Sequence, residues 1–299
     1  MKPPLPLVEG VAPSRQRLPP GAWPTVLDFL AERHAGVGAE AWAARMSRGE
    51  VADETGARLT PASPYRAGAL VYYYREPEPE PPVPFEERII HQDGRLVVAD
   101  KPHFLSVVPA GRFLRETLLV RLKRRTGLAD LVPVHRIDRE TAGVVVFSAD
   151  PSTRGAYATL FQRREVTKVY HALARANEGL DFPVTRRSRV VAGEPFFRMR
   201  EAAGEPNAET RVAVLERRGG GVTLYEARPL TGRKHQVRLH LAALGAPVLN
   251  DRLYPEVLPP PAPEDFSAPL KLLAKSVSFR DPVTGRELRF ESGMELGRG

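Results

Sequence analysis

The chain has 299 residues, of which 42% are hydrophobic, and it carries 44 lysines and arginines against 36 aspartates and glutamates. This length allows one large domain, or a large and a small one, and the apolar content is enough for a sizeable core. Because there is no cysteine, disulfides, thiolate metal sites and cysteine nucleophiles are excluded, which fits the reducing cytosol and makes a cytoplasmic protein the expectation.

Residues 1–21 are rich in proline and lack the apolar segment of a signal sequence. We expect them to form a disordered or loosely attached tail. No run in the chain approaches the roughly 18 uninterrupted apolar residues of a membrane helix, so no membrane association is expected.

Residues 22–75 are expected to form a small α+β domain. Apolar residues at helical spacing between Trp23 and Val51 predict two short amphipathic helices, and the later run LVYYY is typical of a strand. The segment GVGAEA imitates a dinucleotide-binding fingerprint. It follows a helix and not a strand, so we reject that function.

Residues 76–87 alternate prolines and acids, a composition that predicts an extended linker between two domains. Charge is distributed unequally between the two parts of the chain. Residues 1–80 contain 9 basic and 10 acidic side chains, and the remainder contains 35 basic and 26 acidic ones. A basic excess confined to one part of a chain favours a polyanionic partner, most simply a nucleic acid.

Strand signals dominate residues 88–296. β-branched and alternating runs predict strands in five segments: 95–102, 143–150, 167–175, 210–230 and 275–290. The fourth segment contains a hairpin with a glycine turn at residues 217–221. We therefore expect an α+β fold with a largely antiparallel mixed sheet and flanking helices.

Two helices are expected beside this sheet. Residues 114–125 are amphipathic and strongly basic, and residues 151–164 follow Asp150, a suitable N-cap, with proline at the first helical position. Residues 257–269, a second proline cluster, are expected to form a surface loop.

The stretch VPVHRIDRETAGVVVFSAD places Asp138 between Arg136 and Arg139. Adjacent cations favour the ionised carboxylate, so this acid should be charged at neutral pH. A surface ion pair would explain the same spacing. The apolar residues on both sides, however, should hold the loop between buried elements, and such loops often carry catalytic side chains.

A second cluster, RPLTGRKHQVRLHLAALGAPV, contains a helix that Gly245 should end. Thr231 and Gly232 precede the helix, and amide groups there, with Arg233, Lys234 and His235, suit an anion such as phosphate. Arg238 lies beside the apolar stripe of the helix, so it could point inward. A solvated basic face would explain Arg233 and Lys234 equally well.

The histidines do not suggest a metal site. His235 and His240 are five residues apart, which separates them by roughly 140° around a helix. No zinc motif, P-loop or GxSxG elbow is present. Tyr170, in an alternating strand with Lys168 and Ala172 on its face, is most simply a half-buried sheet tyrosine.

Together these segments resemble the RluA-type pseudouridine synthase family over about residues 85–292. HRIDRETAG is similar to the family signature HRLDxxTSG, KVYHAL to its tyrosine-bearing strand, and TGRKHQVRLHLAALGAPVLND to its closing motif TGRxHQIRxHLxxxGxPIxGD. RLVVADKPHFLSVVPAG and LLAKSVSFRDPVTGRELRF resemble its lead strand and last strands. The sequence departs from the family in TAG, where TSG is usual, and in VLND, where VxGD is usual.

The resemblance implies that residues 88–296 form a pseudouridine synthase catalytic domain that isomerises a specific uridine in ribosomal RNA or tRNA. It implies that Asp138 is the essential aspartate, that Tyr170 contacts the base and assists proton removal, and that Arg238 pairs with the aspartate. Arg136 would fill the space left by a flipped uridine. Candidate RNA phosphate contacts are Lys123, Arg124, Arg125, Lys234 and, at the predicted anion site, His235.

The implied reaction needs no metal or other cofactor, and the implied partner is structured RNA bound by a monomer. The N-terminal domain faintly resembles a small RNA-binding domain, with Arg45 and Arg48 as candidate contacts, although a packing role fits it as well. Two alternatives remain: a non-catalytic RNA-binding protein on the same scaffold, which would not need Asp138, and a glycosyl hydrolase, which would need a second carboxylate.

Overall fold

The computed structural model describes residues 3–75, 80–111, 113–262 and 264–297. The chain divides into two compact units, Met1–Glu80 and Pro81–Gly299. Part of the expected linker, residues 76–79, lies outside the described residues.

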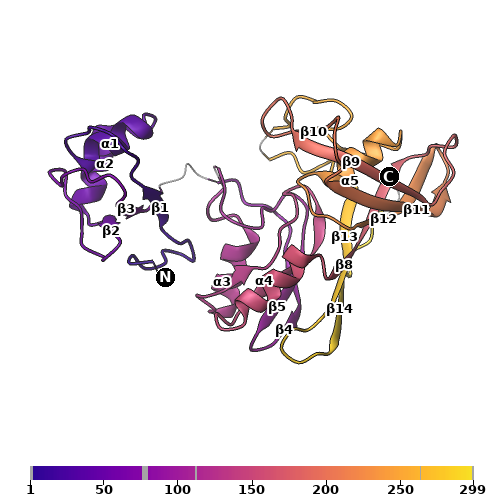
Figure 1. The fold of residues 1–299 in the computed structure, drawn as a ribbon, viewed down its shortest axis with the longest axis horizontal. Helices are drawn as coiled ribbons and strands as arrows, with labels where there is room; N and C mark the ends of the chain where they lie inside the picture. The colour runs from indigo at the N-terminus through magenta and orange to yellow at the C-terminus, as the bar shows by residue number, and fades with distance from the viewer. Residues whose placement is uncertain (1–2, 76–79, 112, 263, 298–299) are drawn as a thin grey trace. The chain divides into compact units, whose positions relative to one another are not determined.

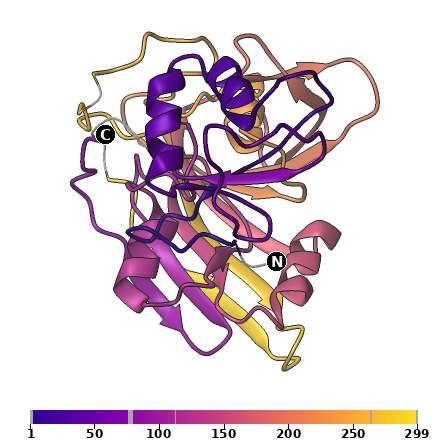
Figure 2. The ribbon, with the colours of Figure 1, turned by 90° about the vertical axis from the view of Figure 1, so that its left-hand side faces the viewer.

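The first unit combines two helices with a small antiparallel sheet. The helices are α1 (Val26–Arg33) and α2 (Ala39–Ser47), and the strands run in the order β1 (Ser14–Arg17), β3 (Leu70–Tyr73) and β2 (Val51–Asp53). A capping box between Thr25 and Asp28 begins α1. The two helices lie next to each other in Figures 1 and 2.

The expectation of a disordered tail at residues 1–21 was wrong for its second half. Ser14–Arg17 pairs with β3, and Leu18 is buried in the core of this unit. The stretch SRQRL contains no proline, so its backbone can join a sheet edge, and Leu18 contributes apolar surface to the core.

Both arginines expected as RNA contacts in this unit have protein partners. The Arg45 guanidinium lies 4.9 Å from the centre of the Trp42 ring, and Arg45 is buried. Arg48 forms an ion pair with Glu50 at 2.8 Å. Arg45 therefore packs inside this unit, whereas Arg48 forms an ion pair at its surface.

The second unit contains one large mixed sheet, in which the described strands run in the order β10, β9, β11, β12, β8, β13, β7, β5 and β4, with β14 on β13 and β6 on β7. In chain order their bounds are Arg88–Gln92 (β4), Leu96–Lys101 (β5), Val132–Pro133 (β6), Ala142–Ser148 (β7), Val166–Arg175 (β8), Val184–Ala192 (β9), Met199–Ala202 (β10), Ala208–Arg218 (β11), Val222–Pro229 (β12), Leu272–Arg280 (β13) and Glu287–Glu291 (β14). Among these described strands, only β7 and β13 pair in parallel. The predicted α+β fold with a largely antiparallel mixed sheet is confirmed.

Helices cover both faces of the sheet around β5 and β7. Leu118 and Leu122 of α3 (Leu118–Thr126) belong to the same core cluster as Val145, whereas Tyr157 of α4 (Arg154–Arg163) packs in the cluster of Val146. Neighbouring residues of a strand point to opposite faces, so α3 and α4 lie on opposite sides of β7 (Figure 2). This explains why the β7 sequence is continuously apolar.

Both predicted helices beside the sheet exist, but each begins later than expected. The Thr117 hydroxyl accepts a hydrogen bond from the Val120 amide and so fixes the start of α3. Asp150 instead accepts hydrogen bonds from Ser152, in a turn before α4, whose N-cap is Thr153. No helix in the described part of the chain has the length and apolar character needed to cross a membrane.

Candidate active site

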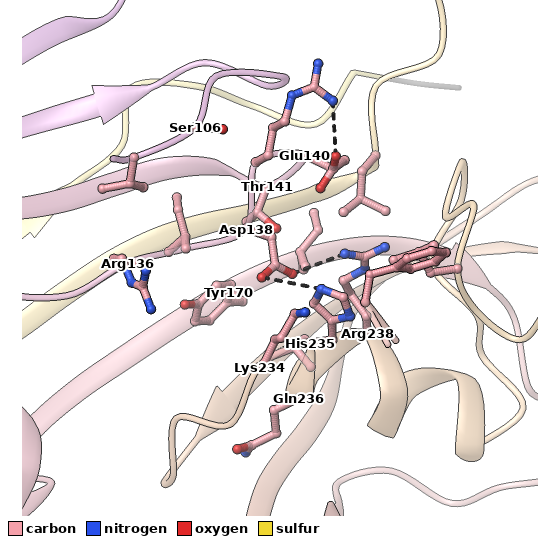
Figure 3. Close-up of a pocket in the computed structure, with 18 of the residues that line it drawn as sticks. Ser106, Arg136, Asp138, Glu140, Thr141, Tyr170, Lys234, His235, Gln236 and Arg238 are labelled. Carbon is pink, nitrogen blue, oxygen red and sulfur yellow. Dashed lines mark hydrogen bonds and ion pairs between the residues drawn. The ribbon is translucent and has the colours of Figure 1, made fainter. Parts of the chain in front are cut away.

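An open cleft of about 1250 Å³ in the second unit brings together three side chains from distant parts of the chain. Asp138 lies in the loop between β6 and β7, Tyr170 lies on β8, and Arg238 lies on α5 (Gln236–Ala243). All three line the cleft, and Figure 3 shows the Asp138 carboxylate between the other two side chains.

Arg238 joins two carboxylates. Its Nη1 donates to Asp138 Oδ2 at 3.1 Å, while its Nε and Nη2 donate to the two oxygens of Asp251 at 2.7 Å each. The Arg238 side chain is 2% exposed and that of Asp138 is 23% exposed. The guanidinium is therefore fixed inside the protein, and the Asp138 carboxylate opens onto the cleft.

The charges around Arg238 keep it protonated. Burial alone would lower the pKa of Arg238, but the hydrogen bonds and charge of Asp251, with the charge of Asp138, outweigh burial and raise it. A permanent cation thus lies beside the Asp138 carboxylate.

The expectation that the flanking arginines supply this charge was wrong. Arg139 forms an ion pair with Glu140 at 3.3 Å, and its guanidinium lies 4.6 Å from the centre of the Phe113 ring. Arg136 is exposed and lines the cleft, apart from the Asp138 carboxylate in Figure 3. Neighbouring side chains in a loop point in different directions, so a position next to Asp138 in the sequence does not by itself bring an arginine to its carboxylate.

His235 lies closer to Asp138 than the sequence indicated. Its Nε2 is 3.9 Å from Asp138 Oδ1, and its Nδ1 is 3.0 Å from the Tyr254 hydroxyl. Burial lowers the pKa of His235, and the charge of Asp138 opposes this effect. The buried ring is thus a neighbour of the carboxylate, whereas Lys234 is exposed at the cleft.

The predicted anion site before α5 is partly filled by the protein itself. Gln236 Oε1 accepts hydrogen bonds from the Arg233 amide at 3.0 Å and from the Thr231 hydroxyl at 2.7 Å. The Gln236 Nε2 donates to the Glu209 carbonyl at 2.9 Å. One of the amide groups expected to hold phosphate is therefore occupied, and the cations of Arg233 and Lys234 remain at the cleft.

Tyr170 and Lys168 lie on the same face of β8 and both line the cleft. Burial raises the pKa of Tyr170, and the charge of Asp138 adds to the shift, so the phenol stays protonated. Burial lowers the pKa of Lys168 to about 8, with a further contribution from Arg164. Lys168 was not predicted as a site residue, although its position two residues before Tyr170 predicts a shared face.

Two residues hold the Asp138 loop by its backbone. Lys101 Nζ donates to the carbonyls of Arg139 at 3.0 Å and Leu105 at 2.7 Å, and His103 Nδ1 lies 2.7 Å from the carbonyl of Glu140. Lys101 is fully buried, and burial lowers its pKa to about 7. The ADKPH segment carries no local signal for this contact with the Asp138 loop.

The two departures from the family motifs occupy positions that accept the observed residues. Ala142 packs in an apolar cluster with Leu273, where no hydroxyl is required. Asn250 has φ +62°, a left-handed conformation that asparagine adopts more easily than most residues besides glycine. Neither departure disturbs the contacts of Arg238, and Asp251, missed as a site residue, follows Asn250 directly.

The cations of α3 do not line the cleft. Arg125 Nη1 donates to the carbonyl of Glu87 at 3.1 Å, and burial lowers the pKa of the partly buried Lys123. Arg124 is exposed. Lys123, Arg124 and Arg125 are thus separate from the side chains around Asp138.

Among the residues that the structure describes, no group of three or more histidine, aspartate or glutamate side chains is arranged to hold a metal ion. The described carboxylates at the cleft are those of Asp138, Glu140 and Asp265.

Comparison with known proteins places this chain in a family. Residues 95–243 match the family described as RNA pseudouridylate synthase. An uncharacterized RNA pseudouridine synthase of Synechocystis is 31% identical over 235 residues, which cover 77% of this chain and 79% of that protein. The dual-specificity RNA pseudouridine synthase RluA of Haemophilus influenzae is also 31% identical, over 72% of this chain and 96% of that protein.

Two solved human structures share the fold. RNA pseudouridylate synthase domain containing 4 has a TM-score of 0.53 at 26% identity, over 70% of this chain and 88% of that one. RNA pseudouridylate synthase domain containing 1 has a TM-score of 0.59 at 24% identity, over 72% of this chain and 86% of that one.

Proposed function

Because the chain belongs to the RluA-type family of RNA pseudouridine synthases, we propose that Asp138 is the group by which it isomerises uridine in RNA. The observation that carries this proposal is the pairing of a cleft-exposed carboxylate with a buried arginine, 3.1 Å apart. Uridine and pseudouridine have the same atoms, so the reaction breaks one bond, turns the base and forms another without net oxidation.

Asp138 acts at the anomeric carbon of the ribose. The bond from that carbon to uracil N1 breaks, and uracil C5 bonds to the same carbon after the base has rotated. A carboxylate can attack this carbon or stabilise positive charge on it, as in glycoside hydrolysis. The pairing with Arg238 supports either route, because it holds the carboxylate at a fixed place beside a permanent cation.

Tyr170 contacts the detached base and assists in moving the C5 proton, which is lost while N1 gains one. Its raised pKa, caused by burial and by the charge of Asp138, supports the contact with the base, because a protonated phenol can donate a hydrogen bond to it. Arg136, exposed at the cleft, takes the place of the flipped uridine in the RNA.

The substrate is a specific uridine in ribosomal RNA or tRNA, bound by a monomer in the cytoplasm. Lys234 at the cleft contacts RNA phosphates, as do Lys123, Arg124 and Arg125 on α3. His235, also predicted as an RNA contact, lies beside the Asp138 carboxylate. Residues 22–75 form a separate small α+β domain whose candidate RNA contacts, Arg45 and Arg48, are bonded within the protein, and residues 88–296 form the catalytic domain. The basic excess after residue 80, 35 cations against 26 acids, supports a polyanionic partner for the second unit.

Two experiments test this function. Pseudouridine mapping of total RNA from cells with and without the gene should identify sites that disappear with it. With an RNA carrying such a site, Asp138→Asn should bind as tightly as the wild type and form no pseudouridine, while the exposed control Asp181→Asn should retain full turnover. Substantial turnover by Asp138→Asn would remove the carboxylate from the reaction.

A further inference from the structure

The hairpin between β9 and β10 exposes two aromatic rings to solvent. Phe196 is 88% exposed, more than any other large hydrophobic residue in the described part of the chain, and Leu230 follows at 51%. Phe197 is also exposed and lines the active-site cleft. The two ring centres are 5.5 Å apart with the ring planes at 74°, so they form one projecting surface, named here the aromatic tip.

Hydrogen bonds and a cation–ring contact fix the turn that carries the aromatic tip. The amides of Gly193 and Arg198 close the turn by donating to the carbonyls of Arg198 at 2.9 Å and Pro195 at 2.8 Å. The Arg198 guanidinium lies 5.1 Å from the centre of the Tyr254 ring and donates to the Pro255 carbonyl. The backbone and cation contacts of Gly193 and Arg198 therefore hold the turn that carries the two rings.

A chain of contacts connects the foot of the aromatic tip to the Asp138 carboxylate. The Tyr254 hydroxyl accepts from the Met199 amide at 2.8 Å and lies 3.0 Å from His235 Nδ1. His235 Nε2 is in turn 3.9 Å from Asp138 Oδ1. The position of the aromatic tip is thus set by the residues that surround the active site.

The strands behind the tip are basic. Residues 184–205 contain five arginines and three glutamates. Arg189 and Arg200 are exposed, and the pairing of Arg200 with Val191 places both arginines on one face of the hairpin. Exposed rings among exposed cations fit a partner with flat apolar groups on an anionic backbone.

We propose that the aromatic tip stacks on an unpaired base of the RNA near the uridine held in the cleft. This inference rests on the proposed function, which makes RNA the partner. An aromatic ring can stack on any unpaired base, so the tip contributes affinity and position, not sequence reading. A paired base offers no free face inside a helix, so the tip favours a loop or bulge over a continuous duplex.

The test uses the full chain and a single-stranded oligoadenylate that carries one 2-aminopurine, with the corresponding duplex as comparison. Wild-type protein should quench the 2-aminopurine fluorescence of the single strand and not that of the duplex. Phe196→Ala should weaken binding of the single strand by about 5-fold to 150-fold and abolish the quenching, without changing the salt dependence. Phe196→Trp should keep both properties.

Matched variants separate stacking from apolar contact. Phe196→Leu keeps an apolar side chain without a ring and should behave like Phe196→Ala. Leu215→Ala removes an exposed apolar side chain that does not line the cleft and should bind and quench like the wild type. Full quenching by Phe196→Leu or Phe196→Ala would overturn the proposal.

Sedimentation of the same proteins examines a second copy of the chain as the alternative partner. A wild-type dimer that only Phe196→Ala dissociates, with unchanged RNA binding, would also overturn the proposal. Asp138→Asn should quench like the wild type. If the wild type forms pseudouridine in no RNA, the proposed function fails, while ring-dependent quenching would still support base stacking by the tip.

Discussion

Replacing Asp251 by asparagine should uncouple Arg238 from the protein interior. The carboxylate of Asp251 accepts two hydrogen bonds from Arg238 at 2.7 Å, and both side chains are buried. Asparagine has nearly the same shape but no charge, and its amide NH₂ would face a guanidinium donor. Asp138, at 3.1 Å, would then be the only carboxylate bonded to Arg238 among the described residues.

The size of the effect follows from these contacts. Hydrogen bonds to charged groups contribute about 1.5–3 kcal/mol each, and removing one partner of a buried ion pair costs about 3–5 kcal/mol. We therefore expect Asp251→Asn to lower the free energy of unfolding by about 4 kcal/mol. For a unit of this size, that change corresponds to a decrease in Tm of roughly 8–16 °C.

The assays are thermal unfolding by circular dichroism and pseudouridine formation well below the lowered Tm. Because the guanidinium would be free to move away from Asp138, kcat should fall by about 10-fold or more with little change in KM. Asp181→Asn neutralises an exposed carboxylate and should change Tm by less than about 2 °C. A Tm for Asp251→Asn within this same range would refute the assignment of Asp251 as the anchor of Arg238.

Four further substitutions examine the sheet, a buried histidine and the two classes of cation. Gly143→Ala should lower the free energy of unfolding by about 3–5 kcal/mol, measured by denaturant unfolding. The reason is that a Cβ there would lie 2.2 Å from the Ala274 carbonyl oxygen, and that φ is +116°. A decrease below about 1 kcal/mol would contradict the close approach of the two strands. Burial lowers the pKa of His240 to about 4. As the pH falls from 6.5 toward 4, the unfolded state therefore takes up a proton before the native state does, and the free energy of unfolding decreases by about 2 kcal/mol by pH 5. His240→Gln should lack that part of the acid loss in unfolding titrations, and an unchanged pH dependence would show that the ring titrates normally. Arg238→Ala should lower kcat by about 100-fold. Lys123→Ala should mainly weaken RNA binding and reduce the slope of log K against log salt concentration by about 1. If both variants lost only affinity, and to the same extent, Arg238 would have no part in the reaction.

The sequence predicted most elements of the second unit because their signals are local. Alternating runs, the glycine turn between β11 and β12 and the Gly245 stop after α5 each specify backbone geometry within a few residues. Helix starts were less predictable. Asp150 and Thr153 are both good N-caps, and only packing against the sheet decides which of them begins α4.

The residues of the site were easier to name than their contacts. Asp138, Tyr170 and Arg238 carry motif signals, and the structure brings all three to one cleft. The partner of Arg238 in the interior, Asp251, and the clamp of the loop by Lys101 depend on tertiary structure, because each joins segments that only the sheet brings together. No local pattern marks a lysine that donates to the carbonyls of Pro102, Leu105 and Arg139, as Lys101 does.

The register of three strands fixes the separation between the end of the Asp138 loop and the backbone of Tyr170. Ala274 of β13 pairs with Gly143 of β7 on one side and with Tyr170 of β8 on the other. Adjacent strands lie about 4.8 Å apart, so the end of the Asp138 loop and the backbone of Tyr170 are separated by roughly 10 Å across β13. Glycine at position 143 permits this spacing, since any side chain there would meet the β13 backbone. The glycine of the HRIDRETAG segment therefore permits the close approach of β7 and β13, on which the separation of the Asp138 loop from Tyr170 depends.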